Sequence, residues 1–292
     1  MIRNKEAFIN YLKNKFGDEV TDYLLDQNKL ELKEGEFVND RGETNKEKVK
    51  EHFSAHFGDE FARQSSGENP SFNGWAFDFP GWIGELTFKN NEPAKEIMVI
   101  GLEPHIENSD YQVTYGLRKK NSIEFEGKLD TNLKALFPHN DFYKQFYITD
   151  MCFFAPKGNA NLIKKVKPKW SEVRQEAAKK FLSDEIEFIA PKIIISSGLD
   201  VAHFVENEIL KIKLEAKVIK WLPQTKPPDW EFCLEIGNLK NLPFITVYEW
   251  KYGKVVHLGV PHLASGRTQL FWTKENKEKL KVRIETILAE LK

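Results

Sequence analysis

The sequence predicts an α/β fold of three layers, in which helices cover both faces of a central, mainly parallel sheet, and an N-terminal helical extension precedes this domain. Short apolar runs typical of buried strands lie at 96–102, 145–154, 192–198, 244–250 and 254–260. Segments with apolar residues at helical spacing alternate with these runs, at 171–190, 199–210 and 273–291. Buried strands that alternate with helices are typical of parallel sheets with both faces covered.

The chain length of 292 residues suggests one large domain, or a core domain with an extension. We expect residues 1–90 to form a helical and aromatic-rich extension, and residues 91–292 to form the α/β domain. Helical spacing occurs in AFINYLKNKF and again in VKEHFSAHFGDEFAR. Residues 66–90 are rich in Gly, Pro and aromatic residues, which is typical of an ordered loop leading to a strand. Within residues 211–243, which include the proline-rich WLPQTKPPDW, a short hairpin and a helix both remain open.

Composition limits the cofactors and the compartment. No apolar run approaches the ~20 residues that span a bilayer, and the N-terminus lacks the apolar segment of a signal peptide. We therefore expect a cytoplasmic protein with no membrane partner. The chain contains 2 cysteines, which excludes a four-cysteine zinc or iron–sulfur site within it. No metal and no cofactor is expected, and protein partners are not indicated.

The net charge of −1 gives no sign of a polyanionic partner. Local basic patches at 118–120 and 157–169 nevertheless leave contact with DNA open, because nucleic-acid binding depends on local charge. A lysine-rich run is also typical of a plain solvated surface, so these patches alone do not decide the question.

Polar residues lie at or near the ends of three apolar runs. GLEPH (101–105) stands at the end of the first run, Asp150 lies within the second, and His262 follows the last. Ligands of parallel sheets bind beyond the carboxyl ends of the strands. We therefore expect two carboxylates and one imidazole to converge on one edge of the sheet.

These motifs, in this order, resemble the uracil-DNA glycosylase superfamily. GLEPH is similar to its first motif, Gly-x-(acid or Asn)-Pro, and YITD (147–150) is similar to its base-reading Tyr-Ile-Thr-Asn strand. IAPKIIISSGLDVAHF (189–204) is similar to its helix–strand segment, and PHLASGR (261–267) to its His-Pro-Ser motif with the loop that enters DNA. The resemblance covers residues from about 95 to 290.

The resemblance implies a monofunctional DNA glycosylase that flips a base out of the duplex and hydrolyses its N-glycosidic bond without a cofactor. It implies that Glu103 stabilises the cationic sugar and orients the water, and that His262 stabilises the departing base. Tyr115, in preference to Tyr111, would stack on the base. The implied base-binding residues also include Asp150, His105, Gly101 and Leu102. The implied DNA-binding residues are Ser265, Gly266, Arg267, Lys157 and Asn159.

Two departures from the family pattern bear on the substrate. Uracil-specific members read the base with an Asn, whereas this chain has Asp150, and an ionised carboxylate only accepts hydrogen bonds. Such a group would repel uracil O4 but accept from cytosine N4. His105 replaces a tyrosine that blocks substituents at C5. These two differences favour a modified cytosine, hydroxymethylated or glucosylated, from foreign DNA, which would suit phage defence. A third departure, Leu263 in place of a proline, concerns only how well the last motif matches.

Other readings stay open. The chain could be an ordinary uracil-DNA glycosylase of base-excision repair, or a catalytically inactive nucleic-acid-binding module on the same fold. A nucleotide-binding protein of unrelated descent is disfavoured, because GLEP is no glycine-rich phosphate loop. Among single residues, Glu103 could cap a helix, Asp150 could pair with a lysine, and His262 could be a hydrogen-bonded core histidine.

Overall fold

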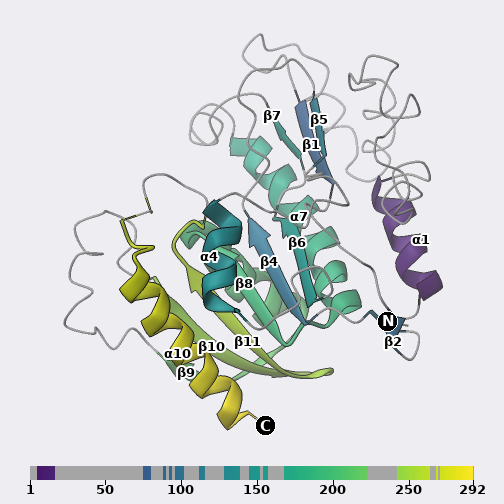
Figure 1. Ribbon diagram of the computed structural model, residues 1–292. Coiled ribbons are helices and arrows are strands. Elements are labelled where there is room, and N and C mark those ends of the chain that lie inside the picture. Colours follow the sequence, from purple (N-terminus) through teal and green to yellow (C-terminus); the bar gives the residue numbers. More distant parts are fainter. Residues whose placement is uncertain are drawn as a thin grey trace. The chain divides into compact units, whose positions relative to one another are not determined.

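The computed structural model describes residues 5–16, 75–79, 88–89, 92–93, 96–101, 112–115, 128–138, 145–151, 154–156, 168–222, 242–263, 268 and 270–291 (Figure 1). The chain divides into two compact units, which we call the first and the second unit. The first unit comprises Met1–Pro93, Glu103–Lys120 and Ile148–Ile189. The second unit comprises Ala94–Leu102, Asn121–Tyr147 and Ala190–Lys292.

Six of the described strands form one sheet in the order β6-β4-β8-β11-β10-β9. Their bounds are β4 (Ile97–Gly101), β6 (Phe146–Asp150), β8 (Ile193–Ser197), β9 (Lys217–Leu222), β10 (Phe244–Trp250) and β11 (Gly253–Val260). β8 pairs in parallel with both β4 and β11, whereas β10 runs antiparallel to β11 and β9. The division between the units falls inside β6, after Tyr147. The mainly parallel sheet confirms the predicted fold class.

Local composition explains why the central strands are buried on both faces. All of β8 (IIISS) and the first four residues of β4 (IMVI) are buried. Branched apolar side chains at successive positions point to opposite faces of a sheet, so both faces need a covering layer.

Helices supply these layers. α4 (Lys128–Leu136) and α10 (Lys274–Glu290) contact each other and lie in front of the sheet in Figure 1. α10 begins where the Thr273 side chain accepts a hydrogen bond from Asn276 N, and it buries Leu280, Ile284 and Ile287. α8 (Leu199–Phe204) packs against β8 and β11 and continues as the π-helix η2 (Val205–Lys213).

In the first unit, α1 (Lys5–Phe16) packs against α7 (Pro168–Ile189). The Tyr11 hydroxyl donates to Phe181 O at 2.9 Å, and the ring centroids of Phe8 and Tyr11 lie 5.6 and 5.1 Å from that of Phe188. The same unit holds a sheet in the order β5-β1-β7, formed by β1 (Trp75–Phe79), β5 (Gln112–Tyr115) and β7 (Phe154–Pro156). The short strands β2 (Phe88–Lys89) and β3 (Glu92–Pro93) pair with each other.

Two predictions about elements differ from the structure. The stretch 66–90, expected to be a loop leading to a strand, contains β1, whose residues WAFDF alternate aromatic with smaller side chains. The run 145–154 divides between β6 and β7, which belong to different sheets. For residues 211–243, where a hairpin and a helix were both left open, the structure has the strand β9, which pairs antiparallel with β10. The helix expected in VKEHFSAHFGDEFAR lies outside the described residues.

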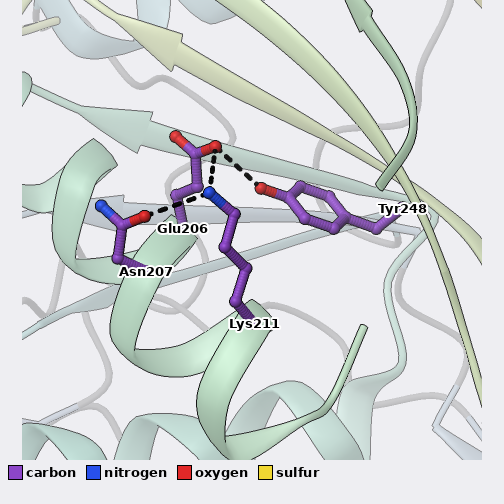
Figure 2. Close-up of polar contacts among 4 residues, drawn as sticks. All are labelled: Glu206, Asn207, Lys211 and Tyr248. Atoms are coloured by element: carbon purple, nitrogen blue, oxygen red, sulfur yellow. Dashed lines mark hydrogen bonds and ion pairs between the residues drawn. The ribbon is translucent and has the colours of Figure 1, made fainter. Parts of the chain in front are cut away.

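A polar cluster joins η2 to β10. The Tyr248 hydroxyl donates to Glu206 Oε1 at 3.1 Å, and Lys211 Nζ lies 3.0 Å from the same oxygen and 3.1 Å from Asn207 Oδ1 (Figure 2). Burial, together with the neighbouring Glu206 carboxylate, raises the pKa of Tyr248 well above its ordinary value. Tyr248 therefore stays protonated and remains a donor to Glu206.

His257 of β11 lies completely buried beside this cluster. Ser196 Oγ is 2.8 Å from His257 Nε2, and within the described part of the chain Nδ1 has no hydrogen-bond partner. Burial lowers the pKa of His257 from 6.5 to about 4; Glu206 opposes this shift and Lys211 adds to it. The histidine is therefore neutral at pH 7 and belongs to the core.

The depressed pKa predicts acid sensitivity. Between pH 6.5 and about 4, the unfolded chain carries more protons at His257 than the folded chain. The contribution of neutral His257 to the free energy of unfolding is therefore complete above pH 6.5. It is lost as the pH falls toward 4, and the loss amounts to about 3 kcal/mol in total. Urea unfolding at pH 7 and pH 4 should show this loss in the native protein, and a His257→Gln variant should lack it. An equal loss in the variant would contradict the assignment.

Candidate active site at the carboxyl edge of the sheet

Three strands of the second unit end together at one edge of the sheet. Ser196 of β8 lies opposite Ile100 of β4 and Gly259 of β11, and Ser197 lies opposite Val260. Gly101, the start of the GLEPH motif, is therefore level with Ser197 and with the last residue of β11. The structure thus brings the beginning of the first predicted motif and of the last one to the same edge.

Asp150 is the last residue of β6, the strand next to β4. Glu96 N donates to Gln145 O at 3.0 Å just before these two strands, so they begin side by side and run in the same direction. Thr149 is buried, and its hydroxyl donates to Glu185 Oε2 of α7 at 3.1 Å. Because successive residues point to opposite faces, the half-buried Asp150 side chain faces away from that contact.

His262 and Leu263, two and three residues beyond β11, are held by their backbone. Leu263 N donates to Ser197 Oγ at 2.9 Å, and Leu263 O accepts from Asn132 Nδ2 of α4 at 2.9 Å. His262 O accepts from Thr268 Oγ1 at 2.5 Å and from Trp272 Nε1 at 3.3 Å. We call this segment, His262 and Leu263 with these hydrogen bonds, the clamped segment. The Leu263 side chain is completely buried, whereas His262 is half-buried.

Gly198 lies beside His262. Its N–H donates to Val260 O at 2.8 Å, and its φ of 104° is a conformation that L side chains rarely adopt. An ideal Cβ at this position would lie 4.0 Å from His262 Cδ2, which is an ordinary contact. Glycine is therefore required here by the backbone conformation and not by lack of room for a methyl group.

The remaining predicted residues are placed as follows. Tyr115 is the last residue of β5 in the first unit, where it pairs with Phe79. The other residues lie outside the described part of the chain, namely Leu102, Glu103, His105, Tyr111, Lys157, Asn159, Ser265, Gly266 and Arg267. Their roles stay predictions. Within the second unit, the structure brings together Gly101 and His262.

Two residues that hold the clamped segment, Asn132 and Ser197, were not predicted. A signal for Asn132 exists in the sequence, because residues 129, 132, 133 and 136 follow the apolar spacing of one helix face. Asn132 is 2% exposed on that face, where a polar side chain needs hydrogen-bond partners. Ser197 had no comparable signal, because it reads as the polar end of a strand.

Two general properties of the described residues complete the picture. Within them, no group of three or more His, Cys, Asp or Glu side chains is arranged to hold a metal ion. No helix among them has the length and apolar character needed to cross a membrane.

Comparison with known proteins gives the family. The family model described as the uracil DNA glycosylase superfamily matches residues 88–283, which is more than half of the chain. No curated protein sequence matches the chain. The chain therefore belongs to the uracil-DNA glycosylase superfamily, and this membership supports a DNA-glycosylase-like hydrolase with DNA as its partner.

Proposed function

We propose that the protein is a monofunctional DNA glycosylase that removes a flipped, modified cytosine from DNA. The observation that carries this proposal is the carboxylate of Asp150 at the end of β6, where the resemblance places the residue that reads the base. An ionised carboxylate accepts hydrogen bonds only, so it suits the N4 amino group of cytosine and repels O4 of uracil.

Glu103 and His262 divide the chemistry between them. The C1′–N1 bond of the nucleotide breaks, its electron pair leaves with the base, and the sugar becomes cationic. Glu103 stabilises this cation and takes a proton from the water that attacks C1′. His262 donates a hydrogen bond to the anionic oxygen of the departing base, which is later protonated. The products are a free base and an abasic sugar.

The clamped segment and the end of β4 support these roles. His262 is half-buried and follows β11 at the edge of the sheet where Gly101 also lies. Glu103 follows Gly101 by two residues. Tyr115 stacks on the flipped base, and the backbone at Gly101 and Leu102 lines its pocket.

His105 leaves room for a substituent at C5, in place of a blocking tyrosine. A hydroxymethylated or glucosylated cytosine fits such a pocket, and foreign DNA is its natural source. Contacts with the duplex come from Ser265, Gly266, Arg267, Lys157 and Asn159. The activity then serves phage defence in the cytoplasm.

Ordinary excision of uracil in base-excision repair is the second candidate, favoured by membership in the superfamily itself. A catalytically inactive binding module is the third.

A panel of oligonucleotides tests the substrate. Single- and double-stranded DNA carrying uracil, cytosine, hydroxymethylcytosine or glucosylated hydroxymethylcytosine should show alkali-labile abasic sites only at a modified cytosine. Abasic sites at uracil would instead support the repair enzyme. Binding of DNA without any abasic site would support the inactive module.

Asp150→Asn should shift base selection toward uracil. The amide can donate to O4 and accept from N3–H, so excision of uracil should rise by about 10-fold or more, the equivalent of one base-specific contact. The measurement is the single-turnover rate on uracil and on modified cytosine. Asp200→Asn, which changes an exposed carboxylate on α8 in the same way, is the matched control and should leave both rates unchanged. A variant with unchanged preference would contradict the role of Asp150.

Glu103→Gln should lower the single-turnover excision rate by about 10²- to 10⁴-fold, because the amide neither stabilises a cation well nor accepts a proton. Glu96→Gln offers a matched control. Glu96 lies at the opposite end of β4, where its exposed carboxylate pairs with Lys192 at 2.6 Å. That variant should retain the native rate. Native excision by Glu103→Gln would refute the mechanism.

A further inference from the structure

We infer that Asn132 is a positioning residue for His262. The inference rests on the proposed function, because it assigns His262 to the reaction. Asn132 touches neither the imidazole nor, in this account, the DNA base. It acts through the backbone of Leu263, to which its Nδ2 donates at 2.9 Å.

The orientation of the Asn132 amide is determined by its second neighbour. Lys277 Nζ of α10 lies 3.4 Å from Asn132 Oδ1. An ammonium group has donors and no acceptor, so the amide atom that faces it must be the oxygen. The amide nitrogen then points to Leu263 O, which can only accept. The contact on each side thus requires the same orientation of the side chain.

Asn132 and Ser197 hold Leu263 from two different elements. Ser197 of β8 accepts from Leu263 N, while Asn132 of α4 donates to Leu263 O. Both residues are nearly inaccessible to solvent: Ser197 is 3% exposed and Asn132 is 2% exposed. Water cannot readily replace either bond at such burial, so loss of one partner leaves a buried backbone group unsatisfied.

The hydrogen bonds to the backbone of Leu263 also restrain the neighbouring residue, His262. The peptide group between His262 and Leu263 contains both His262 O and Leu263 N, and both atoms are bonded to side chains. Leu263 O belongs to the next peptide group, so the bond from Asn132 anchors the chain on the other side of Leu263. Without this anchor the Leu263 backbone can shift, and the direction of the adjacent His262 ring changes with it. A displacement of about 1 Å in a reacting group can cost about 10²-fold in rate.

The test uses the full chain with two substitutions. Asn132→Asp is nearly isosteric and keeps an acceptor toward Lys277, but it loses the donor to Leu263 O. Asn132→Ala removes both contacts. Each should lower the single-turnover rate constant for base excision by about 100-fold, with the affinity for DNA changed less than about 3-fold. Lys134→Ala, at an exposed position of α4, is the control and should keep the native rate constant.

The rate constant separates positioning from folding. A variant that merely folds poorly lowers the amplitude of the single turnover and leaves the rate constant of the folded fraction unchanged. A misplaced His262 lowers the rate constant at full amplitude. A native rate constant in both Asn132 variants would overturn the inference, whatever the amplitude.

An NMR readout keeps this test independent of the proposed function. In the free protein, Asn132→Asp should shift the imidazole signals of His262 and speed hydrogen exchange at the Leu263 amide by about 10-fold or more, with the signals of His257 unchanged. Unchanged His262 signals and Leu263 exchange would refute the clamp even if base excision were observed. If the NMR changes appear and the native protein excises no base, the clamp stands and the proposed function fails.

Discussion

The hydrogen bonds to the Leu263 backbone are the constraint on which the edge of the sheet depends. This residue is completely buried where three strands end, and a buried backbone N–H and C=O must both be paired. Two side chains supply the partners: Ser197 Oγ accepts from the Leu263 N–H, and Asn132 Nδ2 donates to the Leu263 C=O. The result joins β8, α4 and the residues after β11 at one point, next to His262.

The two adjacent serines of β8 connect the Leu263 backbone with the core on the opposite face of the sheet. Ser197 bonds to Leu263, whereas Ser196 points to the opposite face and bonds to His257, which lies beside Glu206 and Lys211 of η2. Each serine is buried with a partner. The end of β8 therefore has a buried hydrogen bond on each face of the sheet. Buried polar groups with all their partners favour one arrangement of the surrounding elements.

The sequence predicted the elements in which apolar residues recur at a clear spacing, and it missed those in which this spacing is weak. The apolar runs of β4, β8, β10 and β11 have only one stable location, a sheet covered on both faces, and the three long helices follow from their apolar spacing. β1 was missed because it lies in a stretch rich in Gly and Pro, where a short alternating strand is not apparent. The stretch that contains β9 was left open between a hairpin and a helix. The motifs placed the chain in its family, whereas the roles of their residues stay predictions. Asn132 was missed because its partner, Leu263, lies 131 residues away, and only the fold brings them together.

The central claim is that this edge of the sheet hydrolyses the bond between a base and its sugar. The most direct measurement is mass spectrometry of the products formed from DNA that contains glucosylated hydroxymethylcytosine. The account predicts a free modified base of unchanged mass and an equal amount of intact strand with one abasic site. A base that stays in the strand, altered or unaltered, would contradict it.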